Sequence, residues 1–324
     1  MKGITVKVGT RGSALALAQT GLLLRSLKQV HPKVNFVVVP IKTAGDRIKT
    51  VAELRRAGKG LFVKEIERAL IAKKVSLAIH SMKDLPSEMP RGLILGAVPE
   101  RVDPRDVFIG RTPTPIDRLP SGSKIATSSL RRQAILKSLY PALEFVEMKG
   151  NLDTRLSKLR APGSALSGLI VAAAGVRRLY PDGSIPVQPL PADRVVPAAG
   201  QGVLALQIRE GDEAMRRLLA PIHHPPTAAS IQAERELQRR LEGGCQVPLG
   251  CYAEATPDGR LTLSACIGTV DGRRLIRSRE SGRIDQPLAL AETLEAALVA
   301  QGAREILAQL APRRAPRKKP RSRR

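Results

Sequence analysis

The chain has 324 residues, of which 43% are hydrophobic, and its 54 lysines and arginines outnumber 29 aspartates and glutamates, for a formal net charge of +25. This length is enough for two or three cores, because single domains usually have about 100–200 residues. The longest apolar runs, such as 169–176, are far shorter than the roughly 20 residues that a membrane-spanning helix needs. The N-terminal stretch also lacks a hydrophobic signal core, so we expect a cytoplasmic protein without membrane association.

Short apolar stretches alternate with amphipathic ones through the first hundred residues, a pattern typical of a parallel sheet flanked by helices. The expected strands are 4–9, 36–41, 75–79 and 93–99, and the expected helices are about 14–30 and 61–74. The polar, proline-containing segment 99–106 then has the character of a linker.

The same pattern restarts after residue 106. Strands are expected at 124–127, 143–148 and 168–175, and helices at 128–140 and 150–159. A strand at 203–208 follows the glycine- and proline-rich passage 195–202. If this strand returns to the first sheet, two chain crossings join the two units, which could then hinge around a cleft.

The pattern changes again after about residue 222. A helix over about 228–241, strand-like stretches at 261–268 and 274–278, and a helix over about 287–309 favour a small α+β unit. We therefore predict an α/β protein with two doubly wound lobes and a small α+β C-terminal domain. The predicted boundaries are 1–100 with 201–220 for the first lobe, 105–195 for the second lobe, and 222–310 for the third domain.

The last 14 residues, 311–324, contain eight basic residues and several prolines, which predicts a disordered tail. Removing these eight charges from the net +25 leaves +17 on the rest of the chain. Such an excess attracts any polyanion, whether nucleic acid, anionic membrane or polycarboxylate metabolite. Four phenylalanines, three tyrosines and no tryptophan offer few stacking platforms, and no nucleic-acid-binding motif is present, so we expect no specific nucleic-acid partner.

Four expected strand ends carry hydroxyl and basic side chains suited to carboxylate or phosphate. They are 10–13 (TRGS), 80–84 (HSMKD), 127–132 (TSSLRR) and 149–155 (KGNLDTR). In parallel sheets, ligands gather where strands end and helices begin. Each site also has a purely structural interpretation, in which Ser13 and Ser128 are ordinary helix caps and the arginines are solvated surface charges. Four such strand ends on one predicted sheet edge nevertheless favour a cleft that binds a polyanion.

Asp84 is an acidic residue beside Lys83 within this basic set. One interpretation is a neutralising ion pair, since structural ion pairs are common. The other is a carboxylate that stabilises a developing positive charge or moves a proton.

Three cysteines, Cys245, Cys251 and Cys266, have neither CxxC spacing nor a nearby histidine, which disfavours a disulfide framework and a zinc site, and we expect no metal. Cys251 and Cys266 lie in strand-like stretches and are expected to be packed and inert. Cys245 lies in the loop EGGCQVPLG, where two glycines allow close approach, and is a candidate for covalent attachment or nucleophilic chemistry.

Residues 4–309 resemble the porphobilinogen deaminase (hydroxymethylbilane synthase) family. The motifs that carry the resemblance are GKGLFVKE (58–65), HSMKDLP (80–86), DPRD (103–106), ATSSLRRQ (126–133), GNLDTRLSKL (150–159), PAAGQG (197–202) and EGGCQVPLG (242–250). The resemblance implies lobes like those of type II periplasmic binding proteins. It also implies a monomeric enzyme that joins four porphobilinogen molecules head to tail, releases ammonia each time, and frees hydroxymethylbilane by hydrolysis.

The resemblance also implies roles for individual residues. Cys245 would carry a dipyrromethane cofactor through a thioether, and Asp84 would act on the pyrrole nitrogens and stabilise the cation left when ammonia departs. The other implied cofactor-binding residues are Lys83, Ser129, Arg131, Arg132, Lys149 and Arg155, and the implied substrate-binding residues are Arg11, Ser13, Lys59 and Arg178. Two positions depart from the family pattern, with Arg55 in place of a common lysine and Lys149 in place of a common arginine.

Two other functions remain open from the residues alone. A non-catalytic two-lobed binding protein would share the lobes, but Cys245 and Asp84 argue against it. A nucleic-acid-associated protein would use the tail, and its retention on DNA would vanish on deletion of 311–324.

Overall fold

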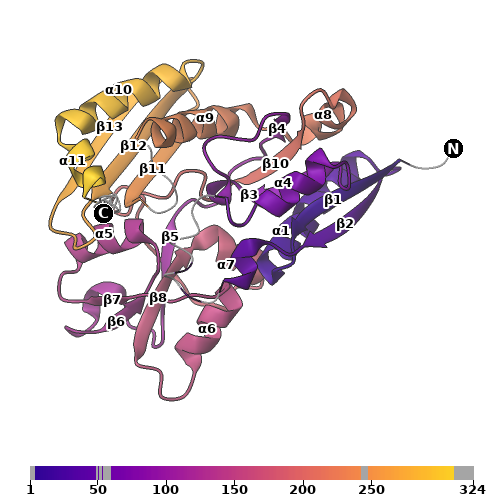
Figure 1. Ribbon diagram of the computed structural model, residues 1–324. Coiled ribbons are helices and arrows are strands. Elements are labelled where there is room, and N and C mark those ends of the chain that lie inside the picture. The colour runs from indigo at the N-terminus through magenta and orange to yellow at the C-terminus, as the bar shows by residue number, and fades with distance from the viewer. Residues whose placement is uncertain (1–3, 49, 51–52, 54–59, 242–246, 310–324) are drawn as a thin grey trace, which may run out of the picture.

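Three β-sheets organise the chain in the computed structural model, which describes residues 4–48, 50, 53, 60–241 and 247–309 (Figure 1). The first sheet has the strand order β2-β1-β3-β10-β4, in which β1, β2 and β3 are parallel and β10 runs antiparallel to both neighbours. Its strands are β1 (Thr5–Arg11), β2 (Asn35–Ile41), β3 (Leu77–Ser81), β4 (Leu93–Ala97) and β10 (Leu204–Arg209).

Helices cover both faces of the first sheet. Its helices are α1 (Ala14–Val30), the short α2 (Ala44–Arg47), α4 (Lys64–Ile71) and α8 (Glu213–Leu219). Leu23 and Leu27 of α1 pack with β1 and β3 residues in one core, and Ile66 and Leu70 of α4 form another on the opposite face. Burial on two faces explains why the central strands β3 and β10 are nearly continuous buried runs, whereas the edge strand β2 is partly exposed.

The second sheet has the order β7-β6-β8-β5-β9, with β6, β7 and β8 parallel and β5 antiparallel to β8. Its strands are β5 (Asp106–Gly110), β6 (Lys124–Ala126), β7 (Glu144–Val146), β8 (Leu166–Ala172) and β9 (Gln188–Pro189). Its helices are α5 (Leu130–Leu139), α6 (Leu152–Arg160) and α7 (Ala173–Leu179), with a 3₁₀ turn η2 (Ile116–Arg118). The predicted strand 168–175 is wrong at its end, because α7 starts at Ala173 directly after β8.

The third sheet is antiparallel, in the order β11-β12-β13, and packs against helices. Its elements are β11 (Leu249–Ala255), β12 (Arg260–Gly268), β13 (Leu275–Arg283), α9 (Pro225–Arg240), α10 (Pro287–Ala300) and α11 (Ala303–Ala308); the 3₁₀ turn η3 (Ala220–Ile222) precedes α9. The predicted single helix 287–309 is wrong, since Gly302 has φ 93° and separates α10 from α11. A left-handed residue of this kind ends a helix, and glycine adopts it without steric cost.

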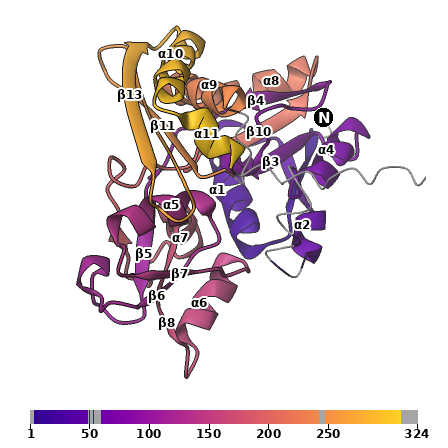
Figure 2. The same cartoon turned by 60° about the vertical axis from the view of Figure 1, so that its left-hand side comes forward.

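The predicted fold class is confirmed, with two α/β sheets and a small α+β unit. β10 lies in the first sheet between β3 and β4, so the chain does cross twice between the first two sheets. The third unit lies beside both, since α5 packs against β12 and β13 while α9 runs close to β4 (Figures 1 and 2). The exact domain boundaries stay predictions.

Segment 99–106 is not merely a linker, since its last residue, Asp106, is the buried first residue of β5. None of the described helices is long and apolar enough to cross a bilayer.

Candidate active site

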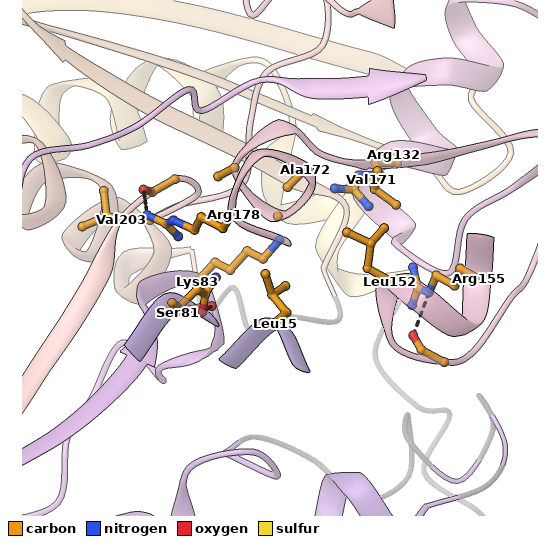
Figure 3. Close-up of a pocket in the computed structure, with 16 residues that line it drawn as sticks. Leu15, Ser81, Lys83, Arg132, Leu152, Arg155, Val171, Ala172, Arg178 and Val203 are labelled. Carbon is orange, nitrogen blue, oxygen red and sulfur yellow. Dashed lines mark hydrogen bonds between the residues drawn. The ribbon is translucent and has the colours of Figure 1, made fainter. Parts of the chain in front are cut away.

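Lys83 lines three cavities, which lie between the first two lobes, between these lobes and the third unit, and within the first lobe. The interlobe cavity, of about 150 Å³, lies between Ser81 on the first-sheet side and Arg132, Arg155 and Arg178 on the second (Figure 3). The Arg131 cavity, of about 200 Å³, has Asp84, Arg131 and Leu249 in its walls. The Arg11 cavity, of about 90 Å³, has Arg11, Ser13, Phe62 and Asp84 in its walls.

Lys83 and Asp84 occupy a single 3₁₀ turn, η1 (Met82–Asp84), that follows β3. The Met82 backbone N–H donates to the Val203 carbonyl at 2.9 Å, which ties the turn to the segment before β10. Lys83 Nζ donates to Gln201 Oε1 at 3.4 Å. Burial, followed by the charge of Arg132, lowers the pKa of Lys83 to about 8, while the charge of Asp84 works in the opposite direction.

Asp84 is half-buried and lines two of the three cavities. Within the described part of the chain its carboxylate makes no hydrogen bond and no ion pair within 4 Å. The alternative of a structural ion pair with Lys83 therefore has no direct contact in its favour. The carboxylate is left to face the cavities.

A buried carboxylate, Asp106, organises the two adjacent arginines of α5. Arg131 Nη1 donates to Asp106 Oδ2 at 2.7 Å, and Arg132 Nη2 and Nε donate to Asp106 Oδ1 at 2.8 and 3.1 Å. Gln201 Nε2 adds a third donor side chain, at 2.8 Å. Burial alone would raise the pKa of Asp106, but the charges and hydrogen bonds of Arg131 and Arg132 hold it well below its usual range.

One negative charge thus compensates two positive ones, and the excess positive charge belongs to side chains that line the cavities. Arg131 Nε is buried and lacks a hydrogen-bond partner among the described residues. Asp106 was not singled out from the sequence, although the DPRD motif at 103–106 contains it.

Arg155 and Arg178 reach the interlobe cavity from α6 and α7 (Figure 3). Arg155 Nε donates to the Gly150 carbonyl at 2.8 Å, and Arg178 Nη2 donates to the Gly202 carbonyl at 2.9 Å. Burial lowers the pKa of each to about 10, aided for Arg155 by the charge of Arg132. Each guanidinium uses one of its nitrogens in these contacts, which leaves other donors for a ligand.

Arg11 ends β1 and forms an ion pair with Asp46 while stacking over Phe62, with 4.1 Å from its Cζ to the ring centroid. Burial would raise the pKa of Asp46, but the Arg11 and Thr43 contacts lower it overall. Arg11 Nε is buried without a hydrogen-bond partner among the described residues.

The predicted hydroxyls lie at helix starts. Ser13 is the N-cap of α1 and accepts from the Ala16 N–H at 3.3 Å, as expected. Ser129, not Ser128, caps α5, accepting from the Arg132 N–H at 3.4 Å. Ser128 instead donates to the Met148 carbonyl at 2.7 Å, because its side chain points back toward the neighbouring strand end.

Some predicted residues are not brought together. Lys149 is half-buried and lies outside the walls of the three cavities. Cys245, Lys59 and Arg55 lie outside the described residues, as does the tail. The expectation of one shared edge is wrong, since the four strand ends belong to two sheets whose edges face each other.

The walls of the cavities suit an acidic ligand. Asp84 is the sole acidic side chain among the described residues that line them, against one lysine and five arginines: Lys83, Arg11, Arg131, Arg132, Arg155 and Arg178. Arginine binds carboxylates through paired N–H donors. The described residues contain no group of three or more metal-ligating side chains.

Comparisons with known proteins identify relatives of this chain over nearly its whole length. Residues 6–217 match the family model described as "Porphobilinogen deaminase, dipyromethane cofactor binding domain", and residues 228–300 match "Porphobilinogen deaminase, C-terminal domain". The chain is 45% identical over 305 residues to the porphobilinogen deaminase of Desulforudis audaxviator, covering 94% of this chain and 97% of that protein. It is 44% identical over 310 residues to the porphobilinogen deaminase of Gloeobacter violaceus, covering 94% of each.

Solved structures align more distantly. A TRAP periplasmic solute binding protein from Desulfovibrio salexigens aligns with a TM-score of 0.40 and 12% identity, over 68% of this chain and 72% of that one. The reduced OxyR regulatory domain from Pseudomonas aeruginosa aligns with a TM-score of 0.39 and 17% identity, over 68% and 96%. With both halves matched by family models and relatives aligned over nearly the whole length, the chain belongs to the porphobilinogen deaminase family.

Proposed function

We propose that this protein is a transferase of tetrapyrrole synthesis that joins four porphobilinogen molecules head to tail into hydroxymethylbilane and releases ammonia at each addition. The observation that carries the proposal is the set of cationic cavities around Lys83, in which Asp84 is the one acidic side chain among the described lining residues. Each pyrrole of the substrate bears two carboxylate arms, so the walls match its charge.

The residues fit a dipyrromethane cofactor. The buried and unpartnered Arg131 Nε, together with Lys83, Arg132 and Arg155, forms a donor set for several carboxylates. Cys245 would hold the group through a thioether, with Ser129 and Lys149 as further contacts. When bound, dipyrromethane supplies the pyrrole carbon to which the first substrate is joined.

Substrate binding is assigned to Arg11, Ser13, Lys59 and Arg178. Arg11 and Ser13 line the smaller cavity next to Asp84, which supports this assignment. Arg11 is held there by Asp46 and Phe62, so its guanidinium is oriented before substrate arrives.

Asp84 would stabilise the positive charge that develops on the substrate when the carbon–nitrogen bond breaks and ammonia leaves. A carboxylate without hydrogen-bond partners can turn toward that charge, and a partly buried position strengthens the attraction relative to water. Lys83 and the arginines hold the carboxylate arms away from Asp84 at the same time.

We also infer a monomer that acts in the cytoplasm without a specific nucleic-acid partner.

Intact-protein mass spectrometry tests the proposal. We expect a mass excess equal to one dipyrromethane, absent from Cys245→Ala, and further one-pyrrole increments when porphobilinogen is added. Asp84→Ala should retain the fold while turnover nearly disappears. A protein that makes the bilane at the bare polypeptide mass would contradict the cofactor assignment, and a folded, loaded protein that leaves porphobilinogen unchanged would contradict the function.

A further inference from the structure

The position of Asp84 is set through its backbone. Its carboxylate has no hydrogen-bond partner in the described part of the chain, so no side chain fixes it directly. Its turn η1 is closed by the Leu85 N–H bonded to the Met82 carbonyl at 3.1 Å. Whatever holds residues 82–87 therefore determines where the carboxylate lies.

Arg235 holds the segment that follows this turn. From α9 its Nη2 donates to the carbonyls of Pro86 and Ser87 at 2.7 and 2.9 Å, and its Nη1 donates to the carbonyl of Leu85 at 3.4 Å. Nη1 also lies 4.0 Å from Met82 Sδ. One guanidinium thus contacts both sides of Asp84 in the sequence.

Arg235 has carbonyl groups rather than a carboxylate as its partners among the described residues. Burial lowers the pKa of Arg235 to about 10, yet within the described residues it has no carboxylate within 4 Å, and its charge is balanced by carbonyl dipoles alone. Charge-assisted bonds to three consecutive carbonyls are a strong constraint on a loop, because each is stronger than a bond between neutral groups.

The helix that carries Arg235 is itself fixed to both crossings between the lobes. The adjacent residue Glu234 is fully buried and accepts from Arg101 Nη2 at 2.6 Å, the Gly200 N–H at 2.6 Å and the Ala253 N–H at 2.8 Å. α9 ends at Arg240, five residues before Cys245 in the sequence. The helix that carries Arg235 is therefore tied by hydrogen bonds to both connections and to β11.

We propose that Arg235 is a positioning residue for Asp84: by gripping the carbonyls of Leu85, Pro86 and Ser87 it fixes the Asp84 turn to α9 during every addition cycle. This inference rests on the proposed function. It predicts that loss of the Arg235 hydrogen bonds slows all four additions to a similar extent, because each addition uses the same Asp84 carboxylate. Loss of an arginine that binds the substrate carboxylates would instead cause enzyme-bound intermediates of one particular length to accumulate.

The first test compares Arg235→Ala with Arg239→Ala in the cofactor-loaded full chain. Arg239 lies one turn further along α9 and lines a surface cavity together with Arg235 and Ser87, but its guanidinium hydrogen-bonds to Glu236 and not to the carbonyls that Arg235 contacts. We expect kcat to fall roughly 10- to 100-fold in Arg235→Ala with KM nearly unchanged, since small displacements of a reacting group have effects of that order. Arg239→Ala should retain wild-type kinetics.

Arg235→Lys keeps the positive charge and separates positioning from folding. A single ammonium cannot reach three carbonyls in the geometry of the planar guanidinium, so kcat should be intermediate between wild type and Arg235→Ala. If Arg235→Ala does not fold, the lysine variant carries the test on its own, with thermal unfolding and cofactor mass as checks that it is native and loaded.

Two results would overturn the inference. One is a native, loaded Arg235→Lys with a kcat within twofold of wild type. The other is a variant that accumulates one particular enzyme-bound chain length by mass spectrometry, which would make Arg235 a ligand-binding residue instead. Failure of the proposed function would be recognised separately, because the wild-type protein would then not consume porphobilinogen.

Discussion

Replacing Asp106 with asparagine should destabilise the protein strongly, although the change removes no volume. The carboxylate accepts from Arg131, Arg132 and Gln201, and it is fully buried. The asparagine amide can accept through only one oxygen, and its NH₂ group would face guanidinium donors. Two buried positive charges would then have no counter-charge.

The size of the effect follows from burial. The side chains of Arg131 and Arg132 are 4% and 8% exposed, so solvent screens them little. Removing one partner of a buried ion pair costs about 3–5 kcal/mol. Because proteins are stable by about 5–15 kcal/mol, this is a large share of the free energy of unfolding.

Urea denaturation followed by far-ultraviolet circular dichroism measures the loss. The control is Asp285→Asn, which breaks an exposed ion pair with Arg283 and should leave the urea midpoint almost unchanged. A loss of less than about 1 kcal/mol for Asp106→Asn, the range of exposed pairs, would refute the view that Asp106 compensates the two arginines.

Two further predictions concern ionisation. The pKa of Lys83 is about 8 in the protein without cofactor, so its positive charge is lost as the pH rises through that value. Loading of the cofactor-free protein with the acidic dipyrromethane, followed by intact-protein mass spectrometry, should therefore slow between about pH 7 and pH 9. Lys83→Arg should remove this pH dependence, and a constant wild-type loading rate across that range would contradict the prediction. Burial raises the pKa of the Cys251 and Cys266 thiols, so neither should react with iodoacetamide until the protein is unfolded. Peptide mass mapping measures the labelling. Labelling of either cysteine in the native protein would contradict this prediction.

Sequence patterns predicted the alternating elements well because burial on two faces leaves a strong apolar signal. Sequence patterns did not predict features that depend on a partner far away in the sequence. Asp106 lies in a polar, proline-containing stretch, and its two arginines follow 25 and 26 residues later, so nothing local marks it as the start of a buried strand. The start of α7 was missed since Ala172 precedes it without a polar cap or a breaker.

The candidate site shows the same division. Arg155 belongs to one of the four predicted strand ends and Arg178 comes from the family resemblance, and both line the interlobe cavity. Arg235 was not singled out, because in the sequence it belongs to a helix with Arg239 and Arg240 and looks like one more solvated charge. Only the carbonyls of residues 85–87, about 150 positions away, distinguish it.

The double crossing between the first two sheets has a mechanical consequence. Gln201 in the second crossing donates to the Pro104 carbonyl of the first at 2.7 Å, and Arg101 donates back to the Gln201 carbonyl at 3.0 Å, so the two connections are laced to each other. Two connections that are hydrogen-bonded to each other allow the lobes to rotate about one axis and resist rotation about the others. A lengthening product would therefore be accommodated by widening of the interlobe cavity on the side away from these two connections, while the side next to them keeps its shape.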